Sequence, residues 1–193
     1  MTEKKPDRRA LKTKKAIREG LAELIAEKEL RHITVQELSD RVDIHRVTFY
    51  KHYMDVYDVY EQIEKNVIDE IERIIREYSE TPAFEFYPLM FQYMEENPKI
   101  FRMIFSPNTT AHLRVKITEL IENLCRNVWS SHGNISGDDP TLECVIHYHS
   151  IGCMAIIAGW VLSDFKQSRD FIVKTISDLD QHTEKYILSL KKN

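Results

Sequence analysis

The sequence predicts an all-α protein of about nine helices, on grounds of composition and pattern. Only 5 of the 193 residues are Gly and 6 are Pro, which leaves little material for hairpins or Gly-rich phosphate loops. Hydrophobic residues make up 42% of the chain, enough to bury a substantial core. In the longer segments these residues recur with the helical period. Long helices with few breaks are therefore expected.

The first two predicted helices lie near the N-terminus. A basic arm, residues 4–15, leads into the first helix, which ends near Lys28. Its apolar stripe consists of Ile17, Leu21, Leu24 and Ile25. One face of the second helix carries Val35, Leu38, Ser39 and Val42. The small Ser39 lets another helix cross closely, and Asp43 follows where the bend requires a left-handed residue, a conformation that Asp tolerates.

A third, short helix is predicted from His45 to His52, with an inward and an outward side. The inward positions are Ile44, Phe49 and Tyr53. The outward side suits a DNA groove, since Arg46 can fork onto guanine, Val47 can touch a thymine methyl group and Lys51 can bind phosphate. The predicted DNA-contacting residues are Thr34, Gln36, Arg46, Val47, Thr48, Tyr50, Lys51 and His52. The alternative is a solvated helix face.

This stretch resembles the DNA-binding module of the tetracycline-repressor (TetR) family of bacterial transcription regulators, whose pattern is a helix, then I-T-V-x-x-L-A, a turn, and T-[LF]-Y-x-H-F. The matching residues are Ile33-Thr34-Val35, Leu38-Ser39 and Thr48-Phe49-Tyr50-Lys51-His52-Tyr53. The resemblance extends from about Leu11 to Val67. It implies a helix-turn-helix DNA-binding domain, residues 1–54, and a helical effector-binding and dimerisation domain, residues 55–193. The segments EKELRHITV and IHRVTFYKHY look most similar to the branch of dihydroxyacetone-kinase operon regulators.

Three residues depart from the family pattern. Asp43 stands at the usual turn glycine, and Glu29 at the glycine that usually closes the first helix. Val56 stands where many members place a lysine at the start of the fourth helix. The first two raise questions of backbone conformation, and the third removes an expected phosphate contact.

The remaining helices form the predicted body. Asp55 can cap a long helix that extends to about Tyr78, and Thr81-Pro82 breaks the chain. A short helix begins at Asn97-Pro98 and stops at Ser106-Pro107-Asn108. A loop is expected at 132–139, and the last three long helices are expected over 109–131, 140–165 and 168–190.

Small residues on the helix 140–165 indicate a close helix contact. Gly152, Ala155 and Gly159 share one face, and glycine inside a helix is costly without a packing reason. Members of the resembled family dimerise through their last two long helices. By that resemblance the homodimer interface comprises Gly152, Ala155, Gly159, Ile172, Ile176, Leu179 and Ile187. Ordinary packing within the chain is the alternative.

Aromatic and Met side chains are concentrated in the middle of the chain. In the resembled family the body encloses an effector pocket, and such a lining would suit a small organic ligand. Met103, Trp129 and His147 are expected to line this pocket for an unknown small-molecule effector. Core packing alone is the alternative.

The formal net charge of −4 is unevenly distributed. Up to Tyr53 the chain has 13 Lys+Arg against 9 Asp+Glu, which leaves 14 against 22 from the totals of 27 and 31. The N-terminal part is therefore the expected DNA-binding end. The basic arm is expected to contact the DNA backbone or minor groove rather than to be a solvated tail.

Other classes of function have little support. Cys144, His147 and His149 lack the spacing of a complete metal site, so no metal and no cofactor are expected. The three cysteines have no paired spacing, and no segment reaches the roughly 20 apolar residues that span a bilayer, so a cytoplasmic protein without a membrane partner is expected. An enzyme is not expected, because no nucleophile elbow, metal motif or phosphate loop is visible.

The predicted function is that of a DNA-binding transcriptional regulator. It is expected to be a ligand-responsive repressor that acts as a homodimer on a near-palindromic double-stranded operator. The ligand is expected to act through the helix 55–78, which joins the DNA-binding part to the body. The alternative is a regulator controlled by a protein partner rather than by a small molecule.

Overall fold

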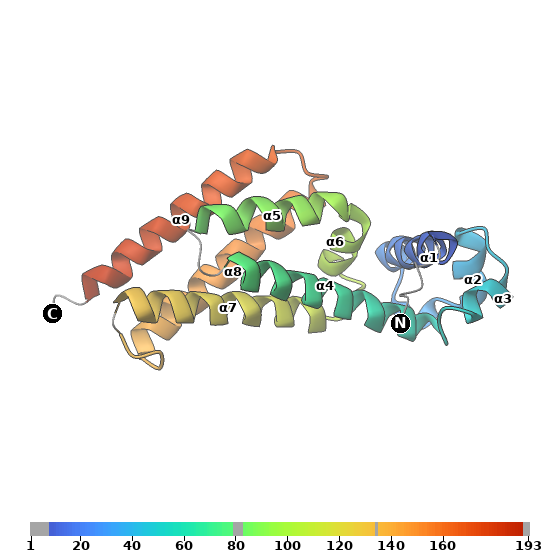
Figure 1. Ribbon diagram of the computed structural model, residues 1–193, viewed down its shortest axis with the longest axis horizontal. Coiled ribbons are helices and arrows are strands. Elements are labelled where there is room, and N and C mark those ends of the chain that lie inside the picture. Colours follow the sequence, from blue (N-terminus) through green and yellow to red (C-terminus); the bar gives the residue numbers. More distant parts are fainter. Residues whose placement is uncertain (1–7, 79–82, 134, 191–193) are drawn as a thin grey trace, which may run out of the picture. The chain divides into compact units, whose positions relative to one another are not determined.

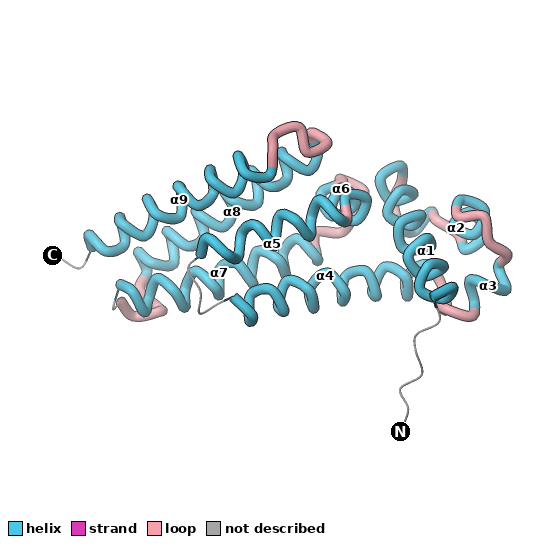
Figure 2. The backbone as a smooth tube through the Cα atoms, turned by 45° about the horizontal axis from the view of Figure 1, so that its top comes forward, coloured by secondary structure: helices cyan, strands magenta, loops and turns pink. Residues whose placement is uncertain are grey.

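The computed structural model describes residues 8–78, 83–133 and 135–190 (Figures 1 and 2). These residues contain nine α-helices, one short 3-10 helix and no strand, which confirms the expected all-α class. The helices form two compact units. Unit 1 comprises Met1–Val67 and Pro98–Thr110, and unit 2 comprises Ile68–Asn97 and Ala111–Asn193.

Unit 1 contains the N-terminal helices and one helix from later in the chain. Its elements are α1 (Arg8–Glu27), the 3-10 helix (Leu30–His32), α2 (Val35–Arg41), α3 (Arg46–Tyr50), the first part of α4 (Val56–Tyr78) and α6 (Pro98–Phe105). α1 packs against α2 and α6, and α2 packs against α3. Its buried side chains include the predicted stripe Ile17, Leu21, Leu24 and Ile25. Residues 4–7 of the basic arm lie outside the described residues, whereas 8–15 form the start of α1.

The position of α6 was not expected from chain order. Lys99 Nζ on α6 lies 2.7 Å from Glu23 Oε1 and 3.6 Å from Glu19 Oε2 on α1. The division between the two units therefore does not coincide with the predicted boundary after residue 54, because part of α4 and residues 98–110 pack with the N-terminal helices. A separate DNA-binding domain at 1–54 stays a prediction.

Gly20 allows α1 and α2 to approach closely. A Cβ atom at this position would lie 2.3 Å from Val42 Cγ1 and 3.3 Å from Leu38 Cδ1. The small side chain of Ser39 is fully buried on α2. Because glycine costs about 1 kcal/mol relative to alanine inside a helix, the close approach gives Gly20 a packing role.

Unit 2 is a bundle of long helices. Its elements are the second part of α4, α5 (Ala83–Glu96), α7 (His112–Gly133), α8 (Pro140–Leu162) and α9 (Arg169–Leu190). α7, α8 and α9 pack against one another, and α5 packs against α9 (Figure 1). One buried cluster that joins α7, α8 and α9 consists of Trp129, Leu142, Ile146 and Ile187.

Hydrogen bonds at both ends of α8 fix where the helix begins and ends, and its C-terminal end differs from the prediction. Asp139 Oδ1 accepts hydrogen bonds from the backbone N–H groups of Thr141 and Leu142, at 2.8 and 3.0 Å. α8 ends at Leu162 instead of continuing to Phe165. Asp164 and Phe165 have left-handed φ angles of 60° and 56°, and the Phe165 N–H donates to the Trp160 carbonyl at 3.0 Å. This pattern closes a helix C-terminus.

From Ile151 to Leu162, α8 is apolar around its whole circumference. By length and composition alone α8 is the one helix among the described residues that could cross a membrane, with a mean hydropathy of 1.6 over its most apolar window, but a buried core helix passes the same test and its longest unbroken apolar stretch is the predicted Ile151 to Leu162. Buried side chains on α8 include Ile146, Ile157 and Trp160, and 44% of that window is buried in the structure. Packing within unit 2 therefore accounts for one side of this helix, and the other side stays exposed.

Candidate nucleic-acid interface

α3 has a buried side that anchors it and an exposed side that a partner can reach. Phe49 and Tyr53 are buried, with ring centroids 5.9 Å apart. Val47 and Tyr50 are 59% and 58% exposed, and the Tyr50 ring meets the Phe49 ring edge-on at 5.6 Å. Ile44, predicted to face inward, is only partly buried. The buried rings therefore fix the direction in which the exposed side chains of α3 project.

The turn before α3 explains one departure from the family pattern. Asp43 has a left-handed φ of 52°, as expected, and the Ile44 N–H donates to the Ser39 carbonyl at 3.0 Å. This hydrogen bond closes the C-terminus of α2 in the way that a glycine usually permits. At the other departure, Glu29 has an extended backbone with φ −63°, so this position does not require glycine.

Side-chain caps fix the starts of α2 and α3. Thr34 Oγ1 accepts a hydrogen bond from the Glu37 N–H at 3.2 Å, which leaves the hydroxyl proton available to a phosphate. His45 Nδ1 accepts from the Val47 N–H at 3.2 Å, so the proton of the neutral ring lies on Nε2. The exposed His45 can therefore donate a hydrogen bond beside Arg46. Sequence reasoning missed this residue, since His is not among the preferred caps.

The cations of α3 differ in their ion pairing from the nearby Arg41 and Lys28. The Arg41 guanidinium donates two hydrogen bonds to the Glu27 carboxylate, both at 3.0 Å, and these lower the pKa of that carboxyl group. Lys28 Nζ lies 2.7 Å from Glu37 Oε1. Among the described residues, neither Arg46 nor Lys51 has an ion-pair partner. The two cations of this segment are therefore available to an anionic partner.

The predicted DNA-contacting residues are mostly accessible. Thr48 and His52 are partly buried, and the other six are exposed. Gln36 Nε2 donates to Asp40 Oδ1 at 2.6 Å, which uses one of its donors. Val56 is buried, so the family's lysine position faces the core here, whereas the neighbouring Tyr57 is exposed.

The residues predicted for the dimer interface fall into two groups. Gly152, Ala155, Gly159 and Leu179 are exposed. Ile172, Ile176 and Ile187 are only 4%, 2% and 1% exposed, so their assignment to an interface was wrong. The stripe of these three isoleucines packs into the chain's own core, because α9 must cover α5 and α8. Large exposed apolar side chains on α8 and α9 are Tyr148, Ile151, Leu162, Phe171, Leu179, Tyr186 and Leu188.

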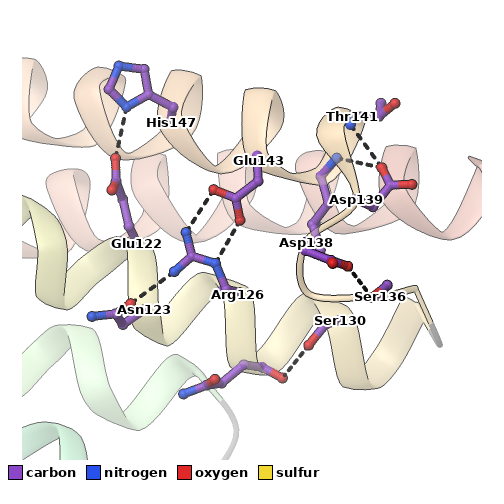
Figure 3. Close-up of polar contacts among 12 residues, drawn as sticks. Glu122, Asn123, Arg126, Ser130, Ser136, Asp138, Asp139, Thr141, Glu143 and His147 are labelled. Carbon is purple, nitrogen blue, oxygen red and sulfur yellow. Dashed lines mark hydrogen bonds and ion pairs between the residues drawn. The ribbon is translucent and has the colours of Figure 1, made fainter.

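Of the three residues predicted to line an effector pocket, His147 lines the groove along α8, whereas Met103 and Trp129 are core residues. Met103 is fully buried in unit 1. Trp129 is buried in the core of unit 2, whereas His147 points outward and its Nδ1 lies 2.9 Å from Glu122 Oε1 (Figure 3). Cys144 and His147 are exposed and His149 is buried, and all three line the groove along α8; among the described residues, however, His149 groups with Cys153 and Asp180 as a candidate metal-ligand set, not with Cys144 or His147.

The surface of unit 2 includes the following two grooves among the described residues. The first, of about 590 Å³, lies between α4 and α7 and is lined by Glu72, Ile75, Arg76, Leu120, Asn123, Leu124, Asn127, Val128, Ser131 and His132. The second, of about 1000 Å³, follows α8 and includes residues of α7 and α9. The bidentate pair of Arg126 and Glu143, at 2.7 and 2.9 Å, joins α7 to α8 near the second groove (Figure 3).

Comparison with known families defines the class of protein. Residues 82–181 match the family model TetR_C_8, described as a transcriptional regulator C-terminal region. This match covers more than half of the chain, and the chain therefore belongs to this family of transcriptional regulators. Members of the family are regulators, not enzymes. No curated protein matched in the comparison of sequences.

Solved structures of regulators share the fold. The dihydroxyacetone kinase operon activator DhaS is 16% identical with a TM-score of 0.56, covering 90% of this chain and 97% of that chain. The fatty acid degradation regulator FadR from Bacillus halodurans is 15% identical with a TM-score of 0.60, covering 97% of each chain. FadR from Bacillus subtilis, solved in complex with stearoyl-CoA, is 16% identical with a TM-score of 0.55, covering 90% and 97%.

Proposed function

We propose that this regulator binds a specific DNA operator through α3, acts as a homodimer, and is released from the operator by a small molecule. The observation that carries the DNA-binding part is the exposed side of α3. This side presents Arg46 and Lys51 without ion-pair partners among the described residues, beside the exposed Val47. Arg46 is assigned to a guanine edge, Val47 to a thymine methyl group, and Tyr50 and Lys51 to phosphates.

DNA binding is tested with the DNA that flanks the protein's own gene, by fluorescence anisotropy against unrelated DNA. Arg46→Ala is expected to reduce discrimination by about 1 to 3 kcal/mol, since it removes a base contact. Tyr50→Phe is expected to weaken binding to all sequences, since it removes a phosphate contact. Arg31→Ala is the matched control, because Arg31 is an exposed cation of the same unit that is paired with Glu29. Equal losses of specific and non-specific affinity in Arg46→Ala would refute the assigned role.

The apolar circumference of α8 supports the homodimer. A helix that is apolar on all sides is normally covered on all sides, yet one face of α8 is exposed. This face carries Ile151 and the small residues Gly152, Ala155 and Gly159, which would let a partner helix approach closely. On α9, the exposed Leu179 lines the same groove as Ile151, Gly152 and Ala155. Two-fold symmetry would then match a near-palindromic operator.

The two glycines provide a selective test of this interface. A Cβ atom added at Gly152 or Gly159 meets nothing within 4 Å in the single chain. Replacing both with leucine is therefore expected to leave the chain folded and to yield monomers in light scattering. Val115→Leu, at an exposed position on α7, is the control and should leave the dimer intact. A wild-type chain that is monomeric at micromolar concentration would refute the homodimer.

The groove between α4 and α7 is proposed as the effector site. Its apolar residues Ile75, Leu124 and Val128, with polar groups at its rim, would suit a small, partly apolar molecule. The B. subtilis FadR, with which this chain shares the fold, was solved with stearoyl-CoA. α4 lines the groove and runs on into unit 1, so a ligand could act by moving this helix.

The effector site is tested through the thermodynamic coupling between ligand binding and DNA binding, which must be equal in both directions. Operator DNA must weaken the affinity for an inducing ligand by the same factor as the ligand weakens DNA binding, and a coupling of roughly 1 to 3 kcal/mol is expected. Calorimetry with and without operator measures this factor. Leu124→Trp should fill the groove and abolish the response, while Val115→Trp, outside the groove on the same helix, should preserve it. If only a partner protein changes operator affinity, the small-molecule switch is wrong.

A further inference from the structure

A buried polar cluster joins α8 and α9 in unit 2. His149 and Cys153 lie one turn apart on α8 and are each 6% exposed, and Asp180 on α9 has a side chain that is 17% exposed. One ligating atom from each residue lies within 4.8 Å of the other two. His149 Nε2 is 3.3 Å from Cys153 Sγ and 2.5 Å from Asp180 Oδ1. An imidazole, a thiol and a carboxylate therefore converge at one buried point.

The hydrogen bonds of Thr183 determine where His149 carries its proton. The Thr183 hydroxyl donates to the Leu179 carbonyl at 2.9 Å. Its oxygen can therefore only accept from the His149 Nδ1–H, which lies 3.4 Å away. With the proton on Nδ1, the neutral ring directs a lone pair from Nε2 toward Cys153 and Asp180. The Trp129 ring, edge-on at 5.0 Å, packs against the imidazole and fixes its orientation.

Two buried acceptors consequently face each other. Asp180 Oδ1 is buried and has no hydrogen-bond partner among the described residues, because its short contact with His149 Nε2 lacks hydrogen-bond geometry. A buried carboxylate oxygen without a donor is costly, and its proximity to a nitrogen lone pair adds repulsion. A proton or a metal cation held between these atoms removes both penalties, and the set of donor atoms favours a metal.

The donor atoms select the kind of cation. Sulfur, imidazole nitrogen and carboxylate oxygen together are typical ligands of Zn²⁺, whereas Mg²⁺ and Ca²⁺ take oxygen ligands. Tetrahedral bonds of about 2.1 to 2.3 Å place neighbouring ligand atoms about 3.4 to 3.6 Å apart, so Asp180 Oδ1, which lies 2.5 Å from His149 Nε2, must move back by about 1 Å to admit the ion. Deprotonated Cys153 and Asp180 balance a doubly charged ion, so the loaded site is neutral and suits a buried position.

We propose that His149, Cys153 and Asp180 bind a Zn²⁺ ion or another transition-metal ion of the same class, and that this ion joins α8 to α9. Thr183 orients His149 from outside the ligand set. His149, Cys153 and Thr183 also line the groove along α8, which gives the ion a route from solvent. The fourth coordination position belongs to water. This site is distinct from the proposed effector groove and from the face of α3.

Titration with Co²⁺ tests the site in the full, reduced chain after treatment with a chelator. The expected result is a visible d–d absorption with a near-ultraviolet sulfur-to-cobalt band, saturating at about one ion per chain and displaced by Zn²⁺. Cys153→Ser should abolish the sulfur band, and Asp180→Asn should abolish tight binding with little change in side-chain size. Thr183→Val should weaken Zn²⁺ binding by about 10 to 100-fold. Far-UV circular dichroism verifies that each variant is folded.

Cys144→Ser is the matched control, because Cys144 is an exposed cysteine on the same helix. It should leave both absorption bands unchanged. Absence of a saturable spectrum in the wild type would overturn the proposal and would mean that the cluster holds a proton only. The same conclusion would follow if Cys153→Ser and Cys144→Ser had equal effects. Operator binding, measured separately, distinguishes this failure from a failure of the proposed DNA-binding function.

Discussion

Replacing Gly20 with alanine is expected to destabilise unit 1, although the same change stabilises most helices. Alanine gains about 1 kcal/mol of helix propensity over glycine. Its Cβ, however, would lie 2.3 Å from Val42 Cγ1, closer than two carbon atoms can approach. Overpacking of this kind costs about 1 to 3 kcal/mol, so the net change in the free energy of unfolding is a loss of up to about 2 kcal/mol.

The Val42→Ala background separates these two contributions. Because this substitution removes the Cγ1 atom, Gly20→Ala introduced into it should gain the propensity of about 1 kcal/mol without the clash. The interaction energy between the two positions is then about 1 to 3 kcal/mol, measured by urea denaturation followed by far-UV circular dichroism. If Gly20→Ala stabilises both backgrounds equally, the close approach of α1 and α2 does not constrain this position and the reasoning is refuted.

Three further predictions concern other parts of the chain. Asp43 has a left-handed φ of 52°, so Asp43→Gly should raise the free energy of unfolding by up to about 1 kcal/mol and Asp43→Val should lower it by about 1 to 2 kcal/mol. Equal effects of the two substitutions in urea denaturation would contradict this prediction. The hydrogen bonds of Arg126 hold the pKa of the Glu143 carboxyl below its usual value. Their contribution to the stability of the fold is therefore present above the ordinary glutamate pKa and is lost as the pH falls through the lowered pKa of Glu143. Arg126→Gln should return that pKa to its ordinary value in an NMR titration. Ile176→Ala should cost about 2 to 5 kcal/mol of stability as a core cavity, whereas Leu179→Ala should act mainly on the dimer in light scattering.

Local sequence patterns were sufficient to place most helices. Asp55 Oδ1 accepts from the Asp58 N–H at 2.9 Å, and Ser168 Oγ accepts from the Phe171 N–H at 3.3 Å, as their predicted capping roles require. The left-handed Asp43 was also predicted correctly. Each of these features depends on hydrogen bonds or steric limits between residues that are close in sequence, and the residues involved therefore reveal them directly.

Sequence periodicity identified apolar stripes but not the surfaces that they cover. The stripe of α9 was predicted correctly as a helical stripe, yet Ile172, Ile176 and Ile187 pack into the core while Leu179 is exposed. The sequence likewise did not predict that α6 belongs to unit 1, because this placement depends on a contact between α6 and α1, which are far apart in the chain.

The sequence by itself determined the helical class, most helix ends and the two sides of α3, since short-range interactions control these. Only the tertiary structure decided which faces are buried and which polar groups meet. Asp180 gave no signal in the sequence, because its proximity to His149 and Cys153 arises only when α9 packs against α8. Packing between distant segments follows from the shapes of all the surfaces at once, and a local pattern does not contain that information.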